Sequence, residues 1–180
     1  MTLGEFIKTV NYELTDKHSL GYIDRFYDGL LSPRRMEVKS VLEVGMQRGL
    51  SMRLWRDYFT NAEIYGIDVD DCPTANGQER MHPIYGDAYC QQTLDRLGGM
   101  EFDLMIDDGP HTPESWEFFC RHYLKMLRPG GIAVVEDIID TSRTSGLLEL
   151  IGKDKKTTVI HFPKGWTHGL DVIIVENVAP

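Results

Sequence analysis

The sequence is poor in cysteine and in long apolar runs, and each shortage excludes a class of protein. The three cysteines, Cys72, Cys90 and Cys120, form no CxxC pair, and their odd number argues against a disulfide framework. No apolar run approaches the ~18 residues that a membrane-spanning helix needs. The opening MTLGEFIKTV has an early acid and lacks the apolar core of a signal peptide. We therefore expect a protein of the reducing cytoplasm that has no membrane partner.

Positive charge is also scarce. The chain has 19 lysine and arginine residues against 28 aspartate and glutamate residues, which gives a formal net charge of -9. A surface that binds nucleic acid needs a basic footprint to neutralise phosphates, so nucleic acid is not an expected partner. The composition favours a small-molecule partner and leaves homo-oligomerisation open.

Seven apolar segments of strand length alternate with helical patterns along the chain. Strands that are buried on both faces read as continuous apolar runs, as in a parallel sheet covered by helices. We predict an α/β fold, with a doubly wound, mostly parallel seven-stranded sheet of the Rossmann-like type, in one domain over residues 1–180. A helical segment at 1–39 precedes the sheet core at 40–180. The predicted strands are residues 40–45, 63–70, 82–87, 102–108, 130–137, 157–162 and 170–177.

One helix can be predicted in detail from its pattern. Thr112 is a candidate N-cap, Pro113 suits the first helical position, and RPGG at 128–131 is expected to end the helix. Apolar residues recur at helical spacing on one face, which we interpret as core packing. They are Trp116, Phe119, Cys120, Tyr123, Leu124 and Leu127.

Acidic residues follow strand after strand. In a doubly wound sheet, ligands bind at the carboxyl ends of the strands, so an acid at each of these positions indicates a binding site. The residues concerned are Glu43 and Gly45, Asp68 and Asp70, Asp87, Asp107 and Asp108, and Glu136 and Asp137.

The stretch VLEVGMQRGLS, residues 41–51, predicts a ligand-binding loop between a strand and a helix. The dinucleotide fingerprint GxGxxG seats a pyrophosphate with three glycines, but Gln47 and Leu50 stand at two of those positions here. The carboxylate of Glu43 would repel a pyrophosphate and attract an ammonium or a sulfonium. A nicotinamide-dependent oxidoreductase is therefore a disfavoured alternative.

The pattern E-x-G-x-x-x-G, from Glu43 to Gly49, resembles the cofactor loop of class I S-adenosylmethionine (SAM) methyltransferases. The resemblance implies that the acid and the loop hold the methionine moiety, that the next strand-end acid takes the ribose hydroxyls, and that the residues after the third strand meet the adenine. A carboxylate suits the ribose because it can accept two hydroxyl protons. The implied cofactor-binding residues are Glu43, Gly45, Gln47, Gly49 and Ser51 from the loop and helix start, then Asp68, and then Asp87 and Ala88.

Two acidic pairs, in IDDGPH (106–111) and VVEDI (134–138), follow strands that should be neighbours. Oxygen ligands of this kind suit Mg²⁺, and we assign Asp108, Glu136 and Asp137 as candidate metal ligands. Whether Asp107 or Asp108 is the first ligand stays open, and Asp107 is otherwise assigned to the sulfonium side of the cofactor. His111 is the candidate general base. The alternative is that the acids only cap helices.

The D-D-G-x-H loop and the E-D pair, together with TDKHSLGYIDRFYDGLL (15–31), resemble the metal-dependent sugar O-methyltransferases of the macrocin and mycinamicin type, and the related cephalosporin-biosynthesis methyltransferases. The resemblance implies SAM- and Mg²⁺-dependent methylation of a hydroxyl on a small molecule such as a sugar or diol. A metal-independent small-molecule methyltransferase and a non-catalytic SAM-binding module remain as alternatives.

The acceptor pocket has three candidate wall residues, Trp116, Trp166 and His168. The last two lie in PKGWTHG (163–169), between the last two predicted strands. The alternative for this loop is a plain hairpin connection.

Overall fold

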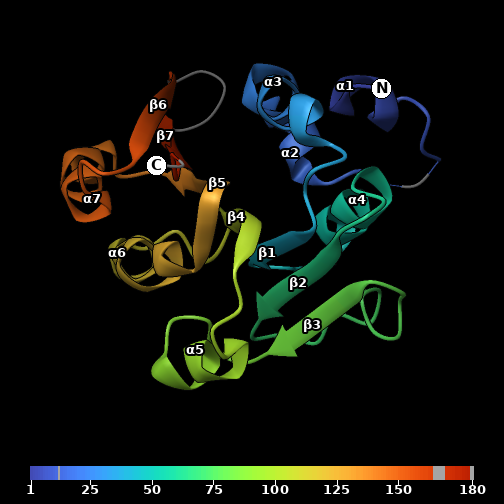
Figure 1. Ribbon diagram of the computed structural model, residues 1–180. Helices are drawn as coiled ribbons and strands as arrows, with labels where there is room; N and C mark the ends of the chain where they lie inside the picture. Colours follow the sequence, from blue (N-terminus) through green and yellow to red (C-terminus); the bar gives the residue numbers. More distant parts are fainter. Residues whose placement is uncertain (12, 164–168, 179–180) are drawn as a thin grey trace.

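The computed structural model describes residues 1–11, 13–163 and 169–178, which contain a seven-stranded sheet of order β3-β2-β1-β4-β5-β7-β6 (Figure 1). Strands β1 to β5 run parallel to one another, whereas β7 runs antiparallel to both β5 and β6. The predicted doubly wound, mostly parallel sheet is thus confirmed. The strands are β1 Ser40–Val44, β2 Glu63–Asp68, β3 Met81–Tyr85, β4 Phe102–Asp107, β5 Leu127–Ile138, β6 Lys156–Phe162 and β7 Leu170–Glu176.

Helices cover both faces of the sheet, with α1 to α4 on one side and α5 to α7 on the other (Figure 1). In the described part of the chain, no helix combines the length and the apolar character needed to cross a bilayer. The α-helices are α1 Leu3–Ile7, α2 Asp16–Ser19, α3 Asp28–Leu31, α4 Leu50–Tyr58, α5 Gln91–Leu97, α6 Pro113–His122 and α7 Thr144–Ile151. The shorter turns are η1 Ile23–Tyr27, which is π-helical, and the 3-10 turns η2 Ser32–Arg34, η3 Tyr123–Met126 and η4 Thr141–Arg143.

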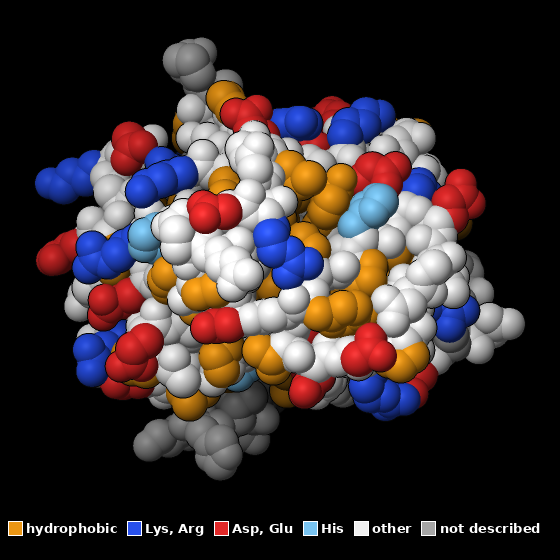
Figure 2. All heavy atoms as spheres, turned by 90° about the horizontal axis from the view of Figure 1, so that it is seen from below, with side chains coloured by type: hydrophobic (Ala, Val, Ile, Leu, Met, Phe, Trp, Pro, Cys, Tyr) orange, Lys and Arg blue, Asp and Glu red, His pale blue; other side chains and the backbone are white. Residues whose placement is uncertain are grey.

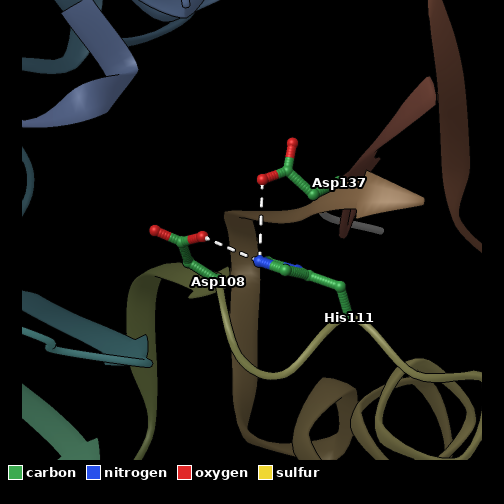
Figure 3. Close-up of side chains that lie close together, drawn as sticks. All are labelled: Asp108, His111 and Asp137. Carbon is green, nitrogen blue, oxygen red and sulfur yellow. Dashed lines mark ion pairs between the residues drawn. The ribbon is translucent and has the colours of Figure 1, made fainter. Parts of the chain in front are cut away.

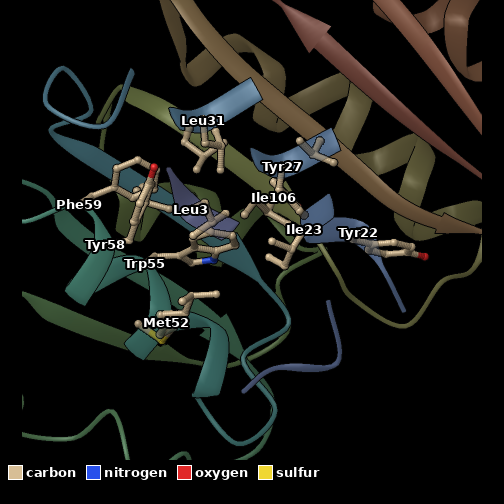
Figure 4. Close-up of a cluster of buried hydrophobic side chains, with 14 of the residues drawn as sticks. Leu3, Tyr22, Ile23, Tyr27, Leu31, Met52, Trp55, Tyr58, Phe59 and Ile106 are labelled. Carbon is tan, nitrogen blue, oxygen red and sulfur yellow. The ribbon is translucent and has the colours of Figure 1, made fainter. Parts of the chain in front are cut away.

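An aromatic cluster joins the N-terminal helices to the sheet (Figure 4). Trp55 of α4 and Phe59, the residue that follows this helix, are fully buried, and the Tyr27 ring packs against Trp55 at a centroid distance of 5.4 Å. Burying one such side chain contributes roughly 1.5–3 kcal/mol, so the cluster fixes the N-terminal segment firmly on this face. Tyr22 lies at the margin of the cluster, and its hydroxyl points away from it (Figure 4). The segment thereby presents polar groups to the edge of the sheet.

Helix α6 begins as predicted and ends earlier than predicted. The Thr112 hydroxyl accepts the Ser115 N–H at 3.2 Å, and all six residues of the predicted stripe are buried. The expectation that RPGG ends the helix was wrong, because the helix stops at His122 and residues 128–131 belong to β5. The pairing of Leu127 with Phe102 draws this segment into the sheet, and a bulge there accommodates the glycines.

Trp116 is only 1% exposed and packs in the core, so its proposed place in a pocket wall was wrong. The stripe that contains it faces the sheet, which explains why core packing was the correct interpretation. Trp166 and His168 lie outside the described residues.

The strand order reverses between β1 and β4, and this switch point positions the site. Val44 of β1 lies beside Ile67 of β2 and Asp107 of β4, so the loops that follow β1 and β4 leave the same edge. Gly45 has φ +91°, and a Cβ atom there would lie 2.0 Å from the carbonyl oxygen of Asp108. The absence of a side chain at this one position therefore lets the glycine loop and the D-D loop pack directly against each other.

We predict that Gly45→Ala destabilises the fold far more than Gly99→Ala. Gly99 has a similar φ of +80° but has open space where a Cβ would lie, so its substitution isolates the backbone cost of roughly 1–2 kcal/mol. Gly45→Ala adds a collision with backbone atoms that cannot rotate away. Urea unfolding of both variants measures the difference, and equal losses of unfolding free energy would contradict direct contact between the two loops.

Candidate active site

A cavity of about 420 Å³ opens at the carboxyl edge of the sheet, next to the switch point. Its size lies within the range of roughly 300–1,000 Å³ that is typical of small-molecule sites. Thr15 and Asp16 bring the N-terminal segment to its wall. The sequence-predicted residues that line the cavity are Gly45, Gln47, Ser51, Asp68, Asp70, Asp87, Ala88, Asp108 and His111.

The face of the molecule seen in Figure 2 carries side chains of both charges. On the face seen in Figure 2, lysine and arginine side chains are interspersed with aspartate and glutamate, and they gather into no broad basic patch. Electrostatic binding of nucleic acid requires such a patch. This face therefore offers no basic footprint.

Asp68, the last residue of β2, holds the glycine loop in shape. Its Oδ2 accepts the backbone N–H groups of Met46 and Gln47, each at 2.8 Å, and Oδ1 accepts the N–H of Asp70 at 3.1 Å. A carboxylate offers about four acceptor positions, so Oδ1 keeps capacity for a ligand hydroxyl. Asp68 thus both shapes the loop and faces the cavity, and the loop-shaping role was not foreseen from the sequence.

Glu43 and Gly49 stand behind the cavity wall. Glu43 is 0% exposed, so its carboxylate is shielded from solvent. Burial raises the pKa of Glu43, and the ammonium of Lys17, 3.3 Å away, partly offsets this effect. Gly49 caps α4 with φ +73° and packs against Cys72 and Thr74. Both residues support the loop from beneath.

The two aspartates of the D-D loop have different surroundings. Asp107 is 1% exposed, does not line the cavity, and accepts the Tyr89 hydroxyl proton at 2.6 Å. Burial raises the pKa of Asp107 to about 7, although the bond from Tyr89 opposes the shift. Asp108 lines the cavity. Of the two aspartates, only Asp108 lies within a group of candidate metal ligands.

That group consists of Asp108, His111 and Asp137 (Figure 3). The Nε2 atom of His111 lies 3.8 Å from Oδ1 of Asp108 and 3.6 Å from Oδ2 of Asp137, and one potential ligand atom from each residue lies within 4.8 Å of the others. His111 and Asp137 both have left-handed backbones, with φ of 55° and 53°. Residues other than glycine rarely adopt this conformation, and such strain gathers at functional sites.

Glu136 lies behind this group and is only 1% exposed. Its Oε2 accepts a proton from Lys17 Nζ at 2.7 Å, and its Oε1 accepts the Tyr27 hydroxyl proton at 2.6 Å. Glu136 is one of the three metal ligands predicted from the sequence. In this structure both of its oxygens already have protein partners, so it would have to exchange one of them to bind an ion.

Lys17 is the buried cation of the site. Its Nζ lies 2.5 Å from Asp108 Oδ2, in addition to its contacts with Glu136 and Glu43. Burial alone would lower the pKa of Lys17, but the attraction of these three carboxylates outweighs it, and the pKa lies well above its ordinary value. The amine is therefore charged at neutral pH.

Sequence reasoning assigned no role in the site to Lys17, Tyr22 or Tyr27, although they lie in the segment 15–31 that resembles the sugar O-methyltransferases. The Tyr22 hydroxyl donates to Oδ1 of Asp137, just as Tyr27 donates to Glu136. The π-helical turn between the two tyrosines bonds each residue to the fifth one along, so residues at this spacing lie on one side of the turn. The five-residue interval was visible in the sequence, but the carboxylates that these residues meet lie more than a hundred positions away.

A sequence profile for the family described as "Methyltransferase domain" matches residues 42–138, just over half of the chain. Demethylmacrocin O-methyltransferase of Streptomyces fradiae is 31% identical over 141 residues, which are 70% of this chain and 35% of that protein. Mycinamicin VI 2''-O-methyltransferase of Micromonospora griseorubida is 31% identical over 121 residues, 62% of this chain and 30% of that protein. The chain spans about a third of the length of these curated relatives.

The fold has a counterpart among solved structures. The MycE methyltransferase from the mycinamycin biosynthetic pathway, in complex with Mg and SAH, aligns with a TM-score of 0.67 at 23% identity over 93% of this chain and 56% of the other. The matched profile spans β1 to β5 and therefore includes the glycine loop, the D-D loop and the E-D pair. The chain belongs to this methyltransferase-domain family, of the class I, SAM-dependent type.

Proposed function

We propose that the protein transfers a methyl group from SAM to a hydroxyl of a small molecule such as a sugar or another vicinal diol, with the help of a divalent metal ion. One observation carries the proposal: a single cavity extends from the loop shaped by Asp68 to the group that contains Asp108 and His111. A donor site and a reaction site therefore adjoin. The relatives' names support the substrate class, since they include a 2''-O-methyltransferase of mycinamicin VI and a 2'-O-methyltransferase of a rhamnosyl tetracenomycin.

The residues around the cavity fit SAM, which supplies an electrophilic methyl group on a sulfonium. Asp68 would accept the ribose hydroxyls through Oδ1, the oxygen that has only one backbone partner. Asp87 and Ala88, after β3, would lie against the adenine. The loop from Gly45 would hold the methionine end, and the buried charge of Glu43 beneath it would favour a cation.

The outer acids fit a hard divalent cation. Lys17 contacts Oδ2 of Asp108 and Tyr22 contacts Oδ1 of Asp137, so each aspartate directs its second oxygen toward the space beside His111 (Figure 3). We propose that these two aspartates hold Mg²⁺, an ion that takes few protein carboxylates and keeps several other oxygen ligands. Such an ion would lower the pKa of an acceptor hydroxyl and orient it.

His111 would act as the general base. It lines the cavity, is 30% exposed, and directs Nε2 toward the space between the two aspartates. A hydroxyl held there would donate its proton to Nε2 as its oxygen attacks the methyl carbon. The loop around Gly45 and the acid group would align oxygen, carbon and sulfur, which accounts for much of the rate in such reactions.

Two alternatives make different demands on these residues. A metal-independent methyltransferase needs His111 but not the paired oxygens of Asp108 and Asp137. A SAM-binding module needs only the cavity. It does not explain why His111 and Asp137 adopt left-handed backbone conformations, which are strained in residues other than glycine. The proposed enzyme uses all of these features.

The donor site predicts that S-adenosylhomocysteine binds, that NAD does not, and that Asp68→Ala weakens binding. Losing a charge-assisted hydrogen bond costs on the order of 1.5–3 kcal/mol, which corresponds to about 10- to 100-fold in affinity. Asp70→Ala is the matched control, because Asp70 also lines the cavity two residues further on. Calorimetry gives the comparison. A larger loss for Asp70→Ala, or tight binding of NAD, would overturn the assignment.

The metal site predicts that Mg²⁺ raises the melting temperature by ordinary linkage, and that Asp137→Asn removes most of this rise. SAM binding should stay nearly unchanged, while methyl transfer to a diol acceptor is lost. Asp154→Asn, an exposed substitution beyond α7, serves as the control. Full transfer in excess chelator, together with a fully active Asp137→Asn variant, would leave the metal-independent alternative.

The base assignment predicts that His111→Ala retains Mg²⁺ binding and loses ~10²–10⁴-fold in the rate of transfer, the usual effect of a positioned base. His82→Ala, on the outer strand β3, should change neither quantity. Single-turnover rates and Mg²⁺ titrations on the same preparations give both readouts. A His111→Ala protein that no longer binds Mg²⁺ would make the histidine a metal ligand instead.

A further inference from the structure

Lys17 is a charged side chain in a place where lysine is rarely found. It is 1% exposed and lies within 3.3 Å of three carboxylates, at 2.5 Å from Asp108, 2.7 Å from Glu136 and 3.3 Å from Glu43. A buried ammonium is tolerated only when it is well paired, and removing one partner of such a pair is strongly destabilising. The contacts span 91 and 119 residues of sequence, so the folded chain creates this position.

The site contains more negative charge than Lys17 can neutralise. Three carboxylates, those of Glu43, Asp108 and Glu136, lie within 3.3 Å of the ammonium, and a fourth, Asp137, lies 3.6 Å from His111 on the outer side. The hydroxyls of Tyr22 and Tyr27 add hydrogen bonds without charge. One divalent ion together with the sulfonium of a bound donor would bring the sum to zero. A second divalent ion would give the site a net positive charge as long as Lys17 stays in place.

Asp108 divides the site into two positions. Its Oδ2 and the carboxylate of Glu136 both accept a hydrogen bond from the Lys17 ammonium. We call the place of this ammonium the inner position. Oδ1 of Asp108 faces His111 and Asp137, which defines an outer position. The Asp108 carboxylate lies between the two positions, as a bridging ligand lies between two metal ions. The Lys17 ammonium already occupies the inner position.

We propose that Lys17 is the permanent inner cation of a two-cation acidic centre, so that its ammonium takes the place of a second metal ion and holds Asp108 and Glu136 ready for a single divalent ion at the outer position. Lys17 is thus a positioning residue. The inference rests on the proposed function only for the outer ion. The inner position follows from the contacts of Lys17 alone.

The test counts Mn²⁺ ions bound per chain, with no donor or acceptor present, in the wild type and in Lys17→Met. Two variants serve as controls. Tyr27→Phe removes a buried contact between the same segment and Glu136 but no charge, and Lys8→Met removes an exposed lysine of the same segment. The wild type and both controls should bind one Mn²⁺. Lys17→Met should bind two, melt lower in chelator, and gain more in melting temperature from Mn²⁺ than the wild type does.

Three results would overturn the proposal. Lys17→Met could bind one ion and melt like the wild type in chelator. It could lose stability that Mn²⁺ does not restore. Alternatively, Tyr27→Phe could change the count as Lys17→Met does, which would make Lys17 a mere anchor of the segment.

A double variant covers the case in which Lys17→Met does not fold without metal. Lys17→Met combined with Glu136→Gln removes one charge of each sign, so it should fold in chelator and bind a single Mn²⁺. If the double variant is no more stable than Lys17→Met, the inner pairing is refuted. A wild type that binds no Mn²⁺ would reject the outer ion of the proposed function, while the stability difference between these two variants would still decide the role of Lys17.

Discussion

The carboxylates that meet at one edge of the sheet repel one another, and the rest of the site is arranged around that repulsion. At a separation of about 4 Å and an effective dielectric constant of about 20, two like charges interact by roughly 4 kcal/mol. Glu43, Asp108 and Glu136 come from the ends of three neighbouring parallel strands, so the fold itself brings them together. Lys17 provides the compensation from a separate part of the chain.

This compensation links the N-terminal segment to the chemistry. The aromatic cluster around Trp55 and Tyr27 holds the segment on the sheet, and the same segment supplies the ammonium and two hydroxyls that bind the acids. Thr15 and Asp16 of this segment also line the cavity. The donor cavity, the acid group and the packing of residues 15–27 are therefore parts of one structure rather than independent features.

Local patterns were enough to predict the sheet and most of the cavity. Apolar runs identified the strands, and strand-end acids identified Asp68, Asp87 and Asp108 as residues of the binding edge. The choice between Asp107 and Asp108 needed the folded surroundings of each side chain. Asp107 lies against Tyr89 in the interior, whereas Asp108 lines the cavity.

Contacts between residues that are far apart in the sequence could not be predicted from the local sequence pattern. Nothing near Lys17 in the sequence reveals that its partners stand at Asp108 and Glu136, and the role of Glu136 depends on that contact. The RPGG break was misjudged for a related reason. Proline and glycine in RPGG are unfavourable in a helix, as the sequence indicates. However, Leu127 pairs with Phe102 in the sheet, and residues 128–131 therefore belong to strand β5.

The most direct test of this account is a crystal structure of the protein grown with Mn²⁺ and S-adenosylhomocysteine, with the ion located by its anomalous scattering. We expect one Mn²⁺ peak between Oδ1 of Asp108 and Oδ2 of Asp137, the ribose on Asp68, and Lys17 still between Glu43 and Glu136. A Mn²⁺ peak at the position of the Lys17 ammonium, or a nucleoside bound away from the cavity beside Gly45, would contradict it.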